Sequence, residues 1–144
     1  MATFRLQSVL DLRQQLEDQA RQLLAATLQR QRSIREQRDR HAANLDRLTC
    51  ELQQRENEGC TITDLQLYRA RIDFERDQMT LLELQLIQVE QEVAQRQDAV
   101  LAARTDREAM ETLKARHLAD ERQRQKQDEI RLLDEVGARG RTPS

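Results

Sequence analysis

The sequence contains few of the residues that make tight turns and compact cores. Its 144 residues include three glycines, one proline and two cysteines but no tryptophan, and aromatic residues make up only 2%. β-Sandwiches, barrels and doubly wound α/β folds need many turns, so none of these fold classes is expected. Charged residues instead make up 35%, beside abundant leucine, glutamine and alanine. This composition is typical of long helices and coiled coils, and it predicts an all-α protein.

Several kinds of functional signal are also missing. The sequence contains no run of about 18 apolar residues, so no membrane-spanning helix is predicted. It also has no long apolar stretch near the N-terminus, so no signal peptide is predicted. We therefore expect a cytoplasmic protein without direct membrane insertion. Cys50 and Cys60 are too few for a disulfide framework or a zinc site, and His41 and His117 are isolated in the sequence. No metal or cofactor site is predicted.

Charges of both signs are interleaved along the chain and leave a net charge of −2. A nucleic-acid-binding protein is expected to show a clear basic excess. The stretch RQRSIREQRDR at residues 30–40 is rich in arginine, and we interpret it as a solvated helix face. RNA binding by this stretch stays an alternative, which a steep loss of binding with rising salt would support.

A heptad pattern is clearest in the second half of the chain. Residues recur there in steps of three and four, which places them along one stripe of a helix that we call the seam. Eleven of the fourteen seam positions are apolar. The positions are Leu65, Tyr68, Ile72, Glu75, Met79, Leu82, Leu86, Val89, Val93, Arg96, Val100, Ala103, Arg107 and Met110.

The start of this second helix carries capping signals. Thr63 and Gln66 have the spacing of a capping box, and Ile62 and Leu67 have the spacing of a hydrophobic staple. The helix is therefore predicted to span about residues 64–136.

The first helix is predicted to span about residues 3–56, followed by a turn at 57–62. Gly59 lies where a preceding helix would need a left-handed C-terminal residue. The seam of this helix is weaker, with eight apolar residues among its fourteen positions. These positions are Leu6, Leu10, Arg13, Glu17, Ala20, Leu24, Thr27, Gln31, Ile34, Arg38, His41, Leu45, Leu48 and Leu52.

The two seams can be paired across one turn. If the two helices pack antiparallel around a turn centred near residue 60, the numbers of two facing residues sum to 120. The facing pairs are then Leu52 with Tyr68, Leu48 with Ile72, Ile34 with Leu86, and Leu10 with Met110. The same rule predicts polar mismatches of Arg38 with Leu82, Glu75 with Leu45, and Arg13 with Arg107. We predict a single antiparallel coiled-coil hairpin over residues 1–136, with helix 2 longer than helix 1 and a disordered tail at 137–144.

Beyond about residue 117, the second helix has no counterpart in the first. Roughly twenty residues, about 30 Å of helix, should then stand alone. They carry apolar side chains among dense charges, namely Leu118, Ile130, Leu132, Leu133 and Val136. This segment is either a partner-binding surface or a solvated tail. No catalytic constellation is present and a two-helix hairpin has no enclosing pocket, so no enzymatic activity is expected.

Three parts of the chain resemble the flagellar export protein FliJ family. The opening FRLQSVLDLR at residues 4–13 is similar to the family's F-x-L-x-x-V-L-x-x-R start, and Gly59 with Tyr68 to its mid-chain turn. The stretch from Arg107 through QKQDEI at 125–130 is similar to its closing segment.

The resemblance implies an antiparallel two-helix coiled coil in the flagellar type III export apparatus, serving flagellum biogenesis and motility. It implies a position at the cytoplasmic face of the inner membrane, with the export ATPase ring and the cytoplasmic domain of the export gate as partners. It also implies contact with export chaperones, or a role as a general export chaperone.

The candidate residues for these partners lie at the two ends of the hairpin. The ATPase candidates are Phe4, Leu6, Leu10, Arg13, Lys114, Leu118, Gln125, Asp128, Glu129 and Ile130. The export-gate candidates are Leu48, Tyr68 and Ile72. Two other readings stay open: the stalk protein of a virulence type III secretion system, and a dimeric coiled-coil scaffold without an ATPase partner.

Overall fold

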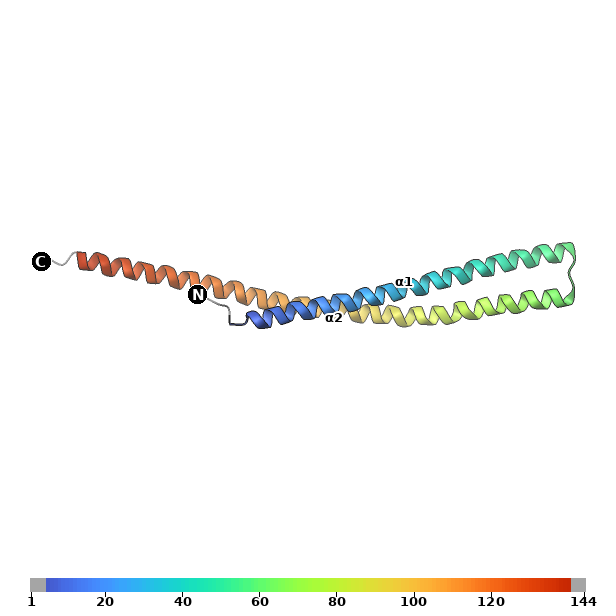
Figure 1. The fold of residues 1–144 in the computed structure, drawn as a ribbon, viewed down its shortest axis with the longest axis horizontal. Coiled ribbons are helices and arrows are strands. Elements are labelled where there is room, and N and C mark those ends of the chain that lie inside the picture. The colour runs from blue at the N-terminus through green and yellow to red at the C-terminus, as the bar shows by residue number, and fades with distance from the viewer. Residues whose placement is uncertain (1–4, 141–144) are drawn as a thin grey trace. The chain divides into compact units, whose positions relative to one another are not determined.

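The structure, a computed structural model, describes residues 5–140 as two long helices joined by a short turn (Figure 1). Helix α1 spans Gln7–Glu58 and helix α2 spans Ile62–Gly140, with 52 and 79 residues respectively. The described part of the chain contains no strand. The predicted fold class, an all-α antiparallel hairpin with a longer second helix, is confirmed.

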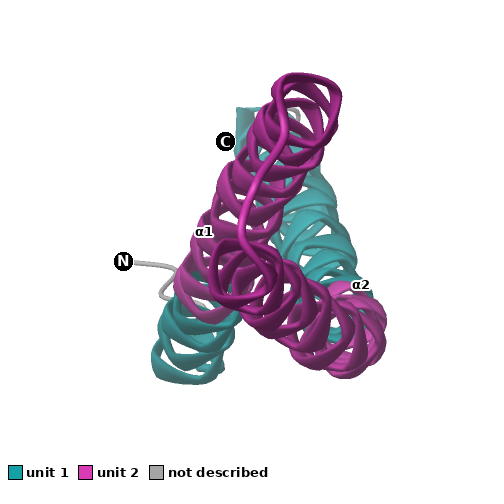
Figure 2. Cartoon of the chain, turned by 90° about the vertical axis from the view of Figure 1, so that its right-hand side faces the viewer, with its two compact units in different colours: residues 1–20, 100–144 teal, residues 21–99 magenta. Residues whose placement is uncertain are grey.

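The chain divides into two compact units, each built from a stretch of both helices (Figure 2). Unit 1 comprises residues 1–20 and 100–144, and unit 2 comprises residues 21–99. Unit 2 contains the turn, and unit 1 contains the start of α1 and the C-terminal part of α2.

The turn is shorter than the predicted stretch 57–62 and consists of residues 59–61. Gly59 has a φ of +92°, in the left-handed region that side chains disfavour. Nothing lies within 4 Å of where a Cβ would be placed on it. The need for glycine is therefore conformational, as expected for the residue that ends a helix.

The cap of α2 is Thr61 and not the predicted Thr63. The backbone amide of Asp64 donates a hydrogen bond of 3.1 Å to Thr61 Oγ1, and the Asp64 carboxylate lies in the first turn, where it suits the helix dipole. The helix thus begins at Ile62. Because Ile62 is the first helical residue and exposed, the predicted hydrophobic staple that includes it is not supported.

The outer ends of both helices also differ from the prediction. The structure describes α1 as beginning at Gln7 rather than about residue 3, and residues 1–4 lie outside the described part. Helix α2 continues through Gly137 to Gly140, so the expected disorder does not begin at 137. A glycine costs an exposed helix only about 1 kcal/mol relative to alanine, which weakens a helix without ending it. Residues 141–144 lie outside the described part.

The predicted seams coincide with the residues that are removed from solvent. All thirteen seam positions within α1 are buried or half-buried, and the fourteenth, Leu6, precedes α1 and is exposed. In α2, thirteen of the fourteen seam positions are buried or half-buried, the exception being Arg96. In unit 2 the largest buried cluster joins Ile34 of α1 to Leu82, Leu86 and Val89 of α2, with Val93 packed against it. The predicted facing of Ile34 with Leu86 is borne out by this cluster.

Two polar seam residues pair with polar side chains of the other helix. Glu75 pairs with His41 across unit 2, where Leu45 was the predicted neighbour. Arg13 does not face Arg107 but donates from Nη1 to Asp106 Oδ2 at 3.3 Å. A small offset from the ideal facing position is enough for these long side chains to reach a counterion beside the seam.

Replacing a core leucine should unfold the hairpin more easily than replacing an outer one on the same helix. Leu86 is 5% exposed and Leu84 is 57% exposed. We expect Leu86→Ala to lower the free energy of unfolding by about 2–4 kcal/mol, because it leaves a cavity against Ile34. Leu84→Ala should change it by less than about 0.5 kcal/mol. Urea unfolding followed by circular dichroism measures both, and equal losses would contradict the seam assignment.

Candidate functional site

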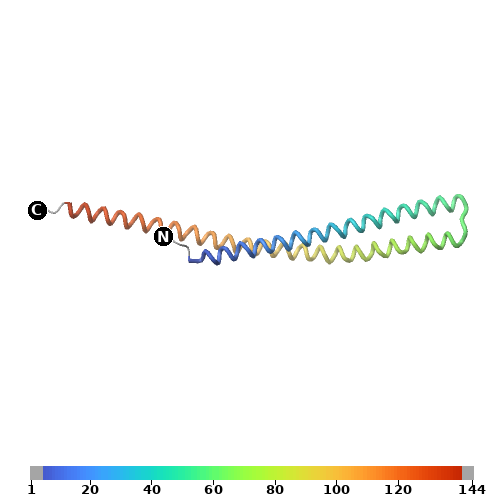
Figure 3. Tube along the Cα trace, viewed as in Figure 1, coloured from blue at the N-terminus to red at the C-terminus, as the bar shows by residue number. Residues whose placement is uncertain are grey.

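The C-terminal stretch of α2 has no helix covering it within unit 1. Half-buried residues recur along α2 as far as Glu121, and every residue from 122 to 140 is exposed. Figure 3 shows α2 continuing past the start of α1. We call residues 122–140 the overhang; at 1.5 Å per residue it is about 28 Å long. The prediction placed its start near residue 117, a little over one turn earlier.

Three apolar side chains share one face of the overhang between residues 130 and 136. Ile130, Leu133 and Val136 follow one another at intervals of three residues, so they form one stripe, and Leu133 is 70% exposed. At 100° per residue, this stripe lies on the opposite side of α2 from the seam. The apolar stripe is therefore a separate surface and not a continuation of the contact with α1.

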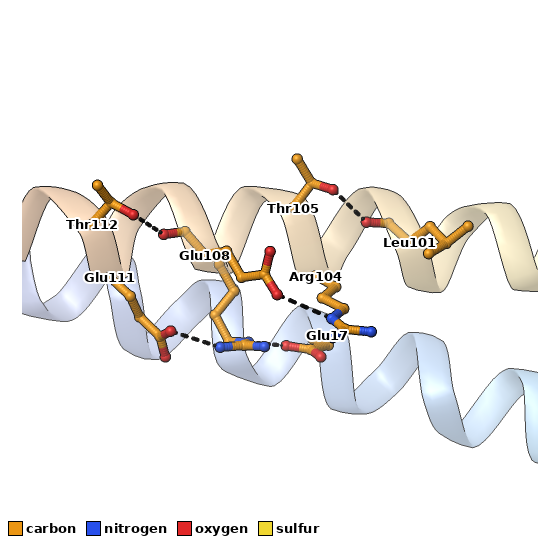
Figure 4. A network of polar contacts seen from close by, with 8 residues as sticks. Glu17, Leu101, Arg104, Thr105, Glu108, Glu111 and Thr112 are labelled. Atoms are coloured by element: carbon orange, nitrogen blue, oxygen red, sulfur yellow. Dashed lines mark hydrogen bonds and ion pairs between the residues drawn. The ribbon is translucent and has the colours of Figure 1, made fainter.

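A buried ion pair anchors the start of α1 beside this end of α2 (Figure 4). Arg107 of α2 donates from Nε to Glu17 of α1, and its Nη1 lies 2.8 Å from Glu111 Oε2. Glu17 is only 3% exposed. The hydrogen bond to Glu17, followed by that to Glu111, raises the pKa of Arg107 above its already high value. The guanidinium therefore stays charged at every ordinary pH and neutralises the buried carboxylate.

This ion pair favours one starting point for the overhang. The guanidinium of Arg107 compensates the burial of the Glu17 carboxylate, which would otherwise be disfavoured away from water. A slip of α1 by one heptad along α2 would separate Glu17 from Arg107. The pair thus favours one register and, with it, one length of uncovered helix.

The predicted ATPase-binding residues fall into groups with different accessibility. Leu10 is buried in the seam and is not available to a partner, while Phe4 lies outside the described residues. The half-buried members are Arg13, Lys114 and Leu118, and the exposed members are Leu6, Gln125, Asp128, Glu129 and Ile130. The exposed members lie at the start of α1 and on the overhang, so unit 1 contains them all.

The predicted export-gate residues are mostly hidden. Leu48 and Ile72 are buried between the helices of unit 2. Tyr68 is half-buried, and its hydroxyl donates to Glu51 Oε2 at 3.5 Å. Leu48 and Ile72 therefore hold the hairpin together and cannot present their side chains to a partner while it is folded.

An exposed aromatic residue near the turn escaped the sequence prediction. Phe74 is 56% exposed and lines a groove of about 420 Å³ in unit 2. The groove is formed by Arg47, Leu48, Ala70, Arg71, Phe74 and Glu75. The signal was a second heptad repeat outside the seam, formed by Leu67, Phe74 and Leu81 at intervals of seven residues.

The described residues offer little that could support chemistry. Residues 5–140 contain no group of three or more His, Cys, Asp or Glu side chains that could hold a metal ion. Cys50 and Cys60 are free thiols. No helix in the described part has the length and apolar character needed to cross a bilayer.

Comparison with known proteins identifies the family. The model of the Flagellar FliJ protein family matches residues 1–140. The chain belongs to this family. Its members are structural components of the type III export apparatus, and the resemblance noted in the sequence is thereby confirmed.

A solved structure has a similar fold. The "Structure of a putative YscO homolog CT670 from Chlamydia trachomatis" aligns with a TM-score of 0.57 and 16% sequence identity, covering 96% of this chain and 94% of that one. At this identity the likeness concerns the fold alone. No curated protein matches the chain.

Removing the guanidinium at the anchor should destabilise unit 1. We expect Arg107→Met to lower the melting temperature, because it removes the guanidinium that bonds to the buried Glu17 carboxylate. The double variant Glu17→Met/Arg107→Met should recover most of the loss, since two apolar side chains can pack in the seam. Arg104→Met is the matched control, because Arg104 is exposed and pairs with Glu108 of its own helix. Thermal unfolding followed by circular dichroism measures all three, and equal effects at 104 and 107 would contradict the anchor.

Proposed function

We propose that the protein is a stalk of the flagellar type III export apparatus. In this proposal, the end formed by the start of α1 and the overhang binds the export ATPase ring. The observation that best supports this proposal is the overhang, a single uncovered helix beside the start of α1 in unit 1. The family assignment supports the flagellar apparatus as its location. In this proposal the protein acts at the cytoplasmic face of the inner membrane and has no enzymatic activity.

The geometry of the overhang suits the centre of a ring. A single α-helix with its side chains is about 10–12 Å wide, narrower than any hairpin. Gln125 lies three residues before Asp128 and four before Glu129, so these three lie on one side of this helix, whereas Ile130 lies on another side. The helix can therefore contact more than one subunit at once. A ligand that binds only the assembled ring stabilises the ring by mass action.

The export gate is assigned to unit 2, near the turn. Exposed Phe74 offers an apolar anchor, and Arg47 and Arg71 line the same groove. Aromatic and arginine side chains often contribute most to binding at protein interfaces. Leu48 and Ile72 then act indirectly, by holding the two helices that form the groove. Export chaperones are further proposed partners, with no surface assigned to them.

Loss of the polar overhang side chains should impair ring assembly. We expect the triple variant Gln125→Ala/Asp128→Ala/Glu129→Ala to need at least about tenfold more protein than wild type to shift the export ATPase from monomer to ring, a loss of about 1.4 kcal/mol. Sedimentation velocity with a non-hydrolysable nucleotide measures the shift.

A matched control carries the same residue types elsewhere on the surface. Asp46→Ala/Gln53→Ala/Glu56→Ala changes three exposed positions of α1 in unit 2 and should assemble the ring like wild type. If the overhang variant also assembles the ring normally, this placement of the ATPase contact is wrong. If wild type leaves the ATPase monomeric, the scaffold alternative is favoured. Repeating the assay with the ATPase of a virulence secretion system tests the other alternative.

Removing the exposed aromatic side chain of Phe74 should weaken binding to the export gate. We expect Phe74→Ala to reduce affinity for the cytoplasmic domain of the export gate at least about tenfold, because an aromatic anchor in a groove contributes strongly to binding. Ile87→Ala, an exposed apolar residue of α2 outside the groove, is the control. Isothermal titration calorimetry measures both affinities. Equal affinities for the two variants would exclude the groove as the gate contact.

A further inference from the structure

The seam of α2 continues into the overhang as a stripe of charges. The steps of three and four that give the half-buried positions Arg107, Met110, Lys114, His117 and Glu121 lead on to Arg124, Asp128, Arg131 and Glu135. We call Glu121, Arg124, Asp128, Arg131 and Glu135 the charged stripe. The sign alternates at each step. Because all five occupy seam positions, they lie on the side of α2 that faces α1 earlier in unit 1.

Helix α1 does not reach the charged stripe. The facing rule places Arg5, the first described residue, opposite residue 115. All stripe residues beyond Glu121 are exposed. The surface therefore continues the interface between the two helices without the helix that would cover it.

We propose that the charged stripe is a self-association surface, on which the overhang of a second copy of this chain lies antiparallel. In an antiparallel pair, the two alternating seam positions face each other, as they do within the hairpin. Arg124 of one copy then faces Glu135 of the other, and Asp128 faces Arg131. The two-fold axis repeats both contacts, which gives four pairs of opposite charge.

The alternating signs select this arrangement over the others. A parallel pair in register would place every charge against its like, which is unfavourable. An antiparallel pair shifted by one heptad toward the start of α2 would bring Arg124 against Asp128, but it would push the second copy onto the segment that α1 covers. A shift the other way keeps Arg131 with Glu135 and loses the remaining contacts. The shift toward the start of α2 forms four opposite-charge pairs as well, since it also brings Glu121 against Arg131, but only the register described above forms its four pairs within the uncovered helix.

The apolar stripe of Ile130, Leu133 and Val136 lies on the other side of the helix and stays uncovered in this pair. The association therefore depends on charge, and exposed ion pairs are individually weak. We expect dimers at about 0.5 mM protein and low ionic strength, and their loss near 1 M salt, where the screening length falls to about 3 Å.

The same spacing also allows ion pairs within one helix. Arg124 Nη1 lies 3.7 Å from Glu121 Oε1, one turn earlier in α2. A charged stripe that only stabilises its own helix needs no second copy. Swapping charges between two variants separates the two roles, because only contacts between chains can be restored by mixing.

The test uses two full-length variants, Arg131→Glu and Asp128→Arg. Alone, each places like charges at the facing positions 128 and 131, so its dimer association should fall at least about tenfold relative to wild type. In the mixture, position 131 of the first variant, now acidic, faces position 128 of the second variant, now basic. Every facing pair is then again of opposite sign. Sedimentation equilibrium should therefore show dimers in the mixture near the wild-type level.

Each outcome decides the question. A monomeric wild type at about 0.5 mM in low salt overturns the proposal, as does a mixture that associates no better than its components. Far-ultraviolet circular dichroism on each variant checks that the overhang stays helical, and wild-type dissociation by salt gives a second measure that involves no substitution. Because the protein is measured alone, failure here leaves the proposed ATPase contact untouched, and failure of that contact leaves self-association standing.

Discussion

The register between α1 and α2 is the constraint on which the rest of the structure depends. Apolar seam residues tolerate a slip of one heptad poorly but do not forbid it, since leucine would still meet leucine over much of the length. Charged seam residues are stricter. Glu17 in the seam pairs with Arg107, and Glu75 pairs with His41, so each unit contains a polar contact that a slip of one heptad would break. Polar residues at these seam positions stabilise the hairpin less than apolar residues would, but they favour one register.

A fixed register also fixes what is left uncovered. Once α1 begins beside residues 107–121 of α2, the remainder of α2 has no neighbour in unit 1. The composition of the α2 seam changes over these same residues: seam positions are largely apolar before residue 107 and charged after residue 121. The overhang is thus suited to water on its seam side, while Ile130, Leu133 and Val136 form a separate apolar surface. An uncovered amphipathic helix of this length is marginal by itself, which fits a segment whose role is to meet another protein.

Sequence periodicity was enough to predict the seams, the glycine turn and the longer second helix, because burial in a two-stranded coil follows position in the heptad. It did not predict details that depend on single hydrogen bonds. Thr61 and Thr63 are equally good caps by residue type, and only the amide of Asp64 shows which one is used. The heptad position also gives the face of the helix on which a residue lies, but not whether a partner can reach that residue. Leu48 and Ile72 looked suitable for binding as apolar residues near the turn, yet that same character buries them, whereas Phe74 lies outside the seam and stays exposed.

Hydrogen exchange on the free protein and on its complex with the export ATPase tests the central claim most directly. In the free protein, backbone amides at 122–140 should exchange fast while those at 65–93 are protected, since only the latter lie in a paired helix. Binding the ATPase should then slow exchange at the start of α1 and at 122–140, with the turn unchanged. Strong protection of the overhang in the dilute free protein, or protection gained only near the turn, would contradict the account.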